Sequence, residues 1–69
     1  MKQTLMAFEV SVDVLGTPHV GTYSVDRGLI TVRSLYGSDS TQLGKLPEET
    51  AARILLRELV DKAKARGEW

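Results

Sequence analysis

The 69-residue sequence contains no cysteine and only one histidine. Disulfides and thiolate metal sites are therefore excluded, and one histidine cannot form a histidine-based metal site without carboxylates. We expect no metal and no cofactor. A chain this short buries only about 60% of its unfolded surface, and small domains commonly compensate by disulfides, metals or self-association. Self-association is the remedy that the composition leaves open.

The sequence also lacks an excess of charge and a long apolar run. Nine basic residues balance nine acidic ones, whereas binders of nucleic acid or anionic membranes usually carry a basic excess. The apolar patch Leu5–Phe8 ends at Glu9, far short of the roughly 20 apolar residues that span a bilayer, and it is not typical of a signal peptide. We expect a single domain over residues 1–69, located in the cytoplasm, with no membrane partner.

Alternating apolar and polar residues predict strands in the first half of the chain. The clearest is Leu5–Leu15, where Met6, Phe8, Val10, Val12 and Val14 share one parity. Val20–Asp26 and Leu29–Tyr36 continue the pattern, joined by a tight hairpin with Gly28 in the left-handed conformation. Gly21 is expected at a bulge or a close approach of two backbones.

Two segments rich in turn residues are predicted to lie outside the strands. Gly16–His19 has the Gly and Pro of a turn and would leave His19 exposed. Gly37–Lys45 is small and polar, and we interpret it as a connecting loop with at most a short fourth strand at Thr41–Leu43. Its hydroxyls precede a helix and could hold a phosphate, but the spacing of a P-loop is absent.

The segment Pro47–Arg66 predicts the one helix. Its apolar residues recur at helical spacing over about half of the cylinder, namely Ala51, Ala52, Leu55, Leu56, Leu59, Val60 and Ala63. Pro47 suits the first turn, acidic residues follow it, basic residues come near the end, and Gly67 is a natural stop. The sequence therefore predicts an α+β fold, a three- to four-stranded antiparallel β-meander with one C-terminal helix on its apolar face (β-β-β-α).

No set of residues in the sequence converges on catalysis. Glu9 and Asp13 share a strand face that we interpret as solvated, because an open sheet face has no pocket to desolvate a carboxylate. His19 has no nucleophile motif such as Gly-x-Ser-x-Gly near it. We therefore predict that the protein is not an enzyme.

Three large apolar residues have no evident place in the core. Leu35 falls on a polar parity, Ile54 lies about 60° outside the apolar stripe of the helix, and Trp69 ends the sequence. A scattered set of exposed apolar residues would be ordinary, but three in so short a chain favour a partner surface. The leading hypothesis is a small homodimeric protein-interaction or regulatory module, formed by strand exchange, edge pairing or helix packing.

A basic helix face supports an alternative function. Arg53, Arg57 and Lys64 share the side of the helix away from the core. In a dimer these residues could contact the phosphates of a nucleic acid. Acidic neighbours on the same helix favour instead a solvated, ion-paired surface.

Four segments of the chain form a further pattern, namely Gly21-Thr22-Tyr23, Tyr36–Gly44, Pro47-Glu48 and Leu55–Leu59. In these segments the chain resembles short uncharacterised bacterial proteins. The resemblance implies no activity and no catalytic residue.

Overall fold

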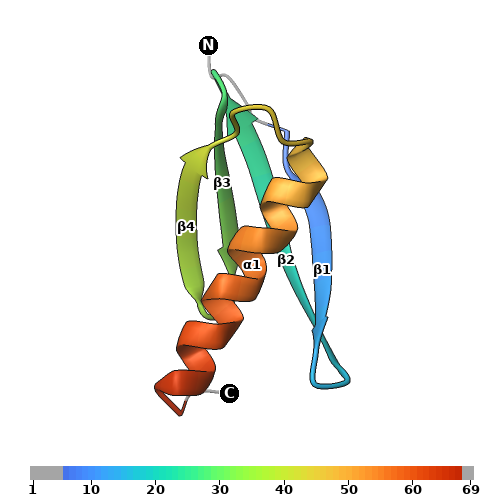
Figure 1. The fold of residues 1–69 in the computed structure, drawn as a ribbon, viewed down its shortest axis with the longest axis vertical. Coiled ribbons are helices and arrows are strands. Elements are labelled where there is room, and N and C mark those ends of the chain that lie inside the picture. Colours follow the sequence, from blue (N-terminus) through green and yellow to red (C-terminus); the bar gives the residue numbers. More distant parts are fainter. Residues whose placement is uncertain (1–5, 68–69) are drawn as a thin grey trace.

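Four strands and one helix form a two-layer structure (Figure 1). The computed structural model describes residues 6–67. The elements are β1 (Phe8–Val14), β2 (Thr17–Asp26), β3 (Leu29–Ser34), β4 (Gly37–Gln42) and α1 (Glu48–Ala65). The strands form an antiparallel sheet in the order β1-β2-β3-β4, and α1 crosses one face of it. The predicted meander followed by a packed helix is confirmed.

Two-residue turns join β1 to β2 and β2 to β3. Leu15 and Gly16 have φ values of 54° and 82°, and Arg27 and Gly28 have 54° and 80°. Positive φ at both positions is the type I′ turn, whose twist matches that of the flanking strands. The predicted left-handed Gly28 is confirmed.

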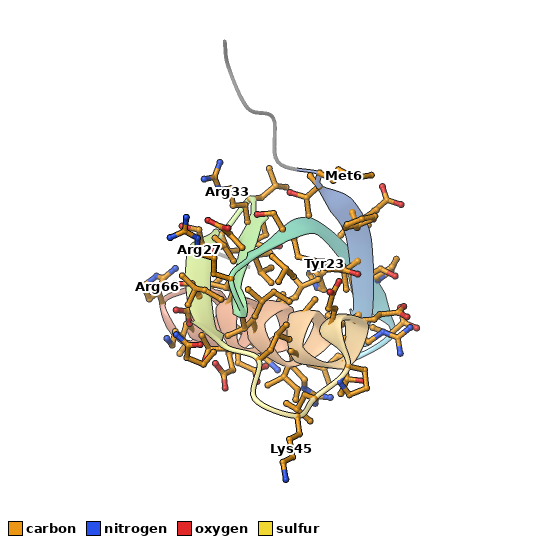
Figure 2. All side chains as sticks on the ribbon, turned by 90° about the horizontal axis from the view of Figure 1, so that it is seen from above. Met6, Tyr23, Arg27, Arg33, Lys45 and Arg66 are labelled. Atoms are coloured by element: carbon orange, nitrogen blue, oxygen red, sulfur yellow. The ribbon has the colours of Figure 1, made fainter. Side chains whose placement is uncertain are left out.

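The core lies between the sheet and α1. Strand residues of one parity meet the seven apolar helix residues expected from the sequence, all of which are buried. Ile30 and Val32 of β3 and Leu56 and Val60 of α1 are fully enclosed. The sheet curves around the helix, and Tyr23 lies inside the curve (Figure 2). Alternation in the strands and 3.6-residue periodicity in the helix therefore generate one shared core.

The ends of α1 follow the sequence signals closely. Pro47 precedes the helix, with φ −59° and ψ 148°, and its carbonyl accepts the first helical hydrogen bond from Ala51 N–H at 3.1 Å. Glu48 and Glu49 occupy the first turn, where the helix dipole favours acidic groups. Gly67 ends the helix with φ 79°.

The interpretation of Gly37–Lys45 as a loop is wrong for most of its length, because Gly37–Gln42 is strand β4. Its residues pair with β3 from Ser34↔Gly37 to Leu29↔Gln42. Gly, Ser and Asp have low strand propensity, so pairing with β3, and not local preference, determines this strand. The short strand suggested at Thr41–Leu43 is the end of β4.

The expected turn at Gly16–His19 is also wrong beyond Gly16. Thr17 begins β2, and His19 is buried with 9% exposure. Val14↔Thr17 is a hydrogen-bonded pair, and hydrogen-bonded and non-hydrogen-bonded pairs alternate along the two strands. Pro18 therefore forms a non-hydrogen-bonded pair with Asp13 of β1. Its nitrogen faces the β3 side of β2, and β3 does not reach Pro18, because the β2–β3 pairing ends at Thr22↔Arg33. The missing N–H of Pro18 removes no hydrogen bond from the sheet.

Candidate functional site

An exposed leucine stands beside a concavity at one end of the sheet. The two-residue turn between β3 and β4 carries Leu35, which is 96% exposed. β2 extends past the end of β3, since its pairing with β3 begins only at Thr22↔Arg33. The space left there is a concavity of about 280 Å³, lined by Thr17, Pro18, His19, Val20, Leu35 and Tyr36. We call Pro18, Val20, Leu35 and Tyr36 the Leu35 patch.

A ring pair holds the two sides of this concavity together. The ring centroids of His19 and Tyr36 lie 5.7 Å apart, and the Tyr36 hydroxyl lies 3.4 Å from His19 Nδ1. Ser34 Oγ accepts a hydrogen bond from Tyr36 N–H at 3.1 Å. These contacts connect the β3–β4 turn to β2. The histidine expected in an exposed turn is thus part of the packing beneath the Leu35 patch.

Val20 is a member of the Leu35 patch that the sequence analysis missed. It is 54% exposed and lies on the sheet face away from α1. The alternation in β2 could have indicated the exposure of Val20, because Val20 shares the parity of Thr22 and Ser24 and not that of Tyr23. No feature of the sequence indicated the concavity, because it arises from the unequal lengths of β2 and β3.

Two of the predicted interface residues, Leu35 and Ile54, lie on different surfaces. Ile54 is 46% exposed and lies in the first half of α1, which begins at the end of the sheet opposite the β3–β4 turn (Figure 1). It borders a groove of about 230 Å³ that also includes Leu46, Leu55 and Thr41. Leu35 therefore belongs to a different surface from Ile54, and Trp69 lies outside the described residues.

Arg53 and Arg57 come together in a cleft between α1 and β1. The cleft has a volume of about 510 Å³ and is lined by Ser11, Val12, Asp13, Arg53, Ile54 and Arg57; we call it the β1–α1 cleft. Arg53 forms an exposed ion pair with Glu49 at 2.9 Å. Acidic groups therefore balance part of the positive charge here.

The third predicted helix cation, Lys64, and two arginines of the sheet region lie elsewhere. Lys64 follows Arg57 by seven residues, about 10 Å along the helix axis, and does not line the β1–α1 cleft. Arg27 and Arg33 project from the outer side of the sheet (Figure 2). The structure therefore brings together two of the three predicted helix cations.

The acidic residues of the outer sheet face remain dispersed. Glu9 pairs with Thr22 across the strands and Asp13 with Pro18. Within residues 6–67 no group of three or more His, Cys, Asp or Glu side chains could hold a metal ion. The same residues contain no helix long and apolar enough to cross a membrane. The strongest features of the described surface are therefore apolar and basic contact areas.

Comparisons of the chain with protein-family models, with curated proteins and with solved structures found no match. Function is therefore argued from the surfaces of this chain.

Proposed function

We propose that the chain is a homodimeric protein-interaction module whose two copies meet through the Leu35 patch. The observation that carries the proposal is the almost complete exposure of Leu35, 96%, next to a concavity with apolar walls. A large apolar side chain at a turn that needs no apolar residue is costly to leave in water.

The geometry of the Leu35 patch suits a two-fold axis. A two-fold interface uses the same surface on both copies, so a projection must lie close to a recess that accepts it. Leu35 is the projection, and the recess of about 280 Å³ beside it is bounded by Val20 and Tyr36. A cavity of roughly 150 Å³ is enough for a benzene-sized group. Each Leu35 would therefore enter the recess of the other copy.

The contact would extend over the outer sheet face. A stable interface buries roughly 800 Å² on each partner, more than one leucine supplies. Val20 and Pro18, two members of the patch, lie on that face, where their cross-strand neighbours are Ser11 and Asp13. The dimer would also add buried apolar area to a chain whose own core is small.

Nucleic-acid binding through Arg53, Arg57 and Lys64 has less support. Glu49 is paired with Arg53, Asp13 lines the same cleft, and Lys64 lies apart from both arginines. A basic surface for phosphates would concentrate cations without such acidic neighbours.

The melting temperature at different protein concentrations tests the dimer. Association of folded chains stabilises them by mass action, so the melting temperature of the wild type should rise between about 5 µM and about 500 µM. Leu35→Ser should remove this rise, because it replaces the apolar projection by a small polar group. Ile54→Ser is the matched control, since it removes an exposed apolar residue from another surface.

Ile54→Ser should lower the melting temperature at every concentration but keep its dependence on concentration. A wild-type melting temperature that is constant over the whole range would refute the proposed dimer. If the melting temperatures of wild type and Leu35→Ser rise equally with protein concentration, the contact between the two copies lies outside the Leu35 patch.

A further inference from the structure

The two edges of the sheet differ in how their outward backbone groups are occupied. In β1, the tight turn makes Val14↔Thr17 a hydrogen-bonded pair, and alternation then directs the N–H and C=O groups of Glu9, Ser11 and Asp13 away from β2. Directly after β4, Leu43 N–H donates to Gly28 C=O at 2.8 Å. The same alternation directs the backbone groups of Ser38, Ser40 and Gln42 outward.

A carboxylate protects the β4 edge. Asp39 Oδ1 accepts a hydrogen bond from the outward N–H of Ser40 at 2.8 Å. An added strand at β4 would have to displace this charged group, a common way in which proteins block edge pairing. Both edges are bordered by a groove beside α1, but the β1–α1 cleft of about 510 Å³ is the larger, against about 230 Å³ for the groove beside β4. Of the two edges, β1 is therefore the one prepared to receive a strand.

The side chains around β1 define the chemistry of such a strand. Alternate residues of an added strand point to opposite faces of the sheet. Those on the helix side would enter the cleft, next to Val12, Ile54 and Arg57, whereas Arg53 is already paired with Glu49. Those on the outer side would lie next to Glu9 and Asp13. The helix-side positions therefore favour acidic and apolar residues, and the outer positions favour basic or hydroxyl residues.

We propose that the β1 edge and the β1–α1 cleft bind an extended segment of another protein as a fifth strand, with acidic residues on its helix-facing side. Main-chain hydrogen bonds to Glu9, Ser11 and Asp13 supply affinity, and Arg57 selects an acidic side chain. The inference extends the proposed protein-interaction role but does not need the dimer, because the cleft shares no residue with the Leu35 patch.

A second copy of the chain does not fit this edge. Antiparallel pairing of two β1 strands through their outward groups would set odd-numbered residues opposite one another. Glu9 and Asp13 of both copies would then share one sheet face. Like charges at opposed positions are destabilising. The occupant is therefore a segment with the complementary pattern.

A labelled heptapeptide tests the proposal by fluorescence anisotropy with the full chain. The peptide has glutamate, valine and glutamate at its three alternate inner positions, and threonine and lysine at the remaining positions. It contains as many lysines as glutamates, so its side chains carry no net charge. Its length matches that of β1. The control peptide has the same side chains but N-methyl groups on alternate backbone nitrogens, which cannot donate to a sheet edge. We expect saturable binding of the first peptide and none of the second.

Substitutions on the two edges test the position. Pro is tolerated in an edge strand where its nitrogen faces solvent, so Ser11→Pro should fold and abolish binding. The matched control is Ser38→Pro, which changes the outward group of β4 and should leave binding intact. Circular dichroism and melting check that both variants fold. Equal loss of binding in the two variants would contradict the assignment to β1.

Charge reversal at Arg57 tests its role in binding the acidic side chains of the peptide. Arg57→Glu should weaken peptide binding by roughly fivefold or more. Lys45→Glu makes the same change in net charge on the β4–α1 loop, where Lys45 projects away from the sheet (Figure 2), and should have little effect. No saturable binding of the peptide by the wild type, equal binding of the N-methylated peptide, or preference for a mixed-sequence oligonucleotide would each overturn the proposal. Leu35→Ser should bind the peptide as the wild type does, which separates this site from the dimer.

Discussion

At the scale of single residues, Gly21 sets how closely α1 packs on the sheet. A Cβ atom at this position would lie 2.7 Å from the carbonyl oxygen of Arg33 and 3.2 Å from Leu56 Cδ1. The close approach expected from the sequence is confirmed. Because a backbone oxygen cannot move without disturbing the β2–β3 pairing, Gly21→Ala should lower the free energy of unfolding by about 1–3 kcal/mol.

Urea denaturation measures this cost, with Thr22→Ala on the outer face as the neighbouring control. The control should change stability much less, because Thr22 is exposed. An unchanged midpoint for Gly21→Ala would mean that the Arg33 carbonyl and Leu56 adjust to the added methyl group without cost.

Leu15 occupies an unfavourable backbone conformation. Its φ of 54° lies in the left-handed region, which is costly for most L-residues, and its side chain is 74% exposed. Asn followed by Gly is the preferred pair for this turn type. Leu15→Asn should therefore raise the free energy of unfolding by roughly 0.5–1 kcal/mol, measured by urea denaturation. A destabilised Leu15→Asn variant would show that the Leu15 side chain makes a contact that outweighs the backbone strain.

At the scale of elements, the Asp39 carboxylate limits association through β4. Asp39→Val removes the group that accepts the Ser40 N–H hydrogen bond and introduces a residue of high strand propensity. We expect assemblies larger than a dimer, seen as an added fast component in sedimentation velocity. Ser38→Val raises strand propensity on the same strand but keeps the Asp39 contact, so it should not form them. Identical profiles for the two variants would refute the protective role of Asp39.

The elements differ in how far the sequence determines them. Helix α1 was predicted within one residue at each end, because periodicity, charge and terminal residues agree. Strand β4 was missed because Gly37–Gln42 has no apolar alternation and forms through pairing with β3. His19 was misplaced because the Gly and Pro before it indicate a turn, whereas pairing with β1 carries the strand back to Thr17.

The candidate surfaces were less predictable than the fold. Strand parity predicts an exposed Leu35, but Leu35 lies in the turn after β3 and not in a strand, and the recess beside it depends on where β3 ends. The β1–α1 cleft depends on the direction in which α1 crosses the sheet, which local sequence does not determine. The sequence identified Arg53, Arg57 and Ile54 as unusual, yet only the assembled fold places them next to the β1 edge.

At the scale of the whole molecule, the two proposed contacts use separate parts of the surface. The Leu35 patch lies around the β3–β4 turn and the facing part of β2, and the β1–α1 cleft lies between β1 and α1. The two surfaces share no residue, but they adjoin on the outer face of the sheet, where Pro18 and Val20 of the patch are cross-strand neighbours of Asp13 and Ser11. The cytoplasmic location expected from the sequence stays a prediction.

Sedimentation equilibrium tests the central claim most directly. At about 50 µM the wild type should have twice the 7.6 kDa mass of one chain, and Leu35→Ser should have the mass of one chain at the same concentration, because association follows mass action. A wild type with the mass of a single chain at this concentration, or a Leu35→Ser variant that remains dimeric, would contradict the account.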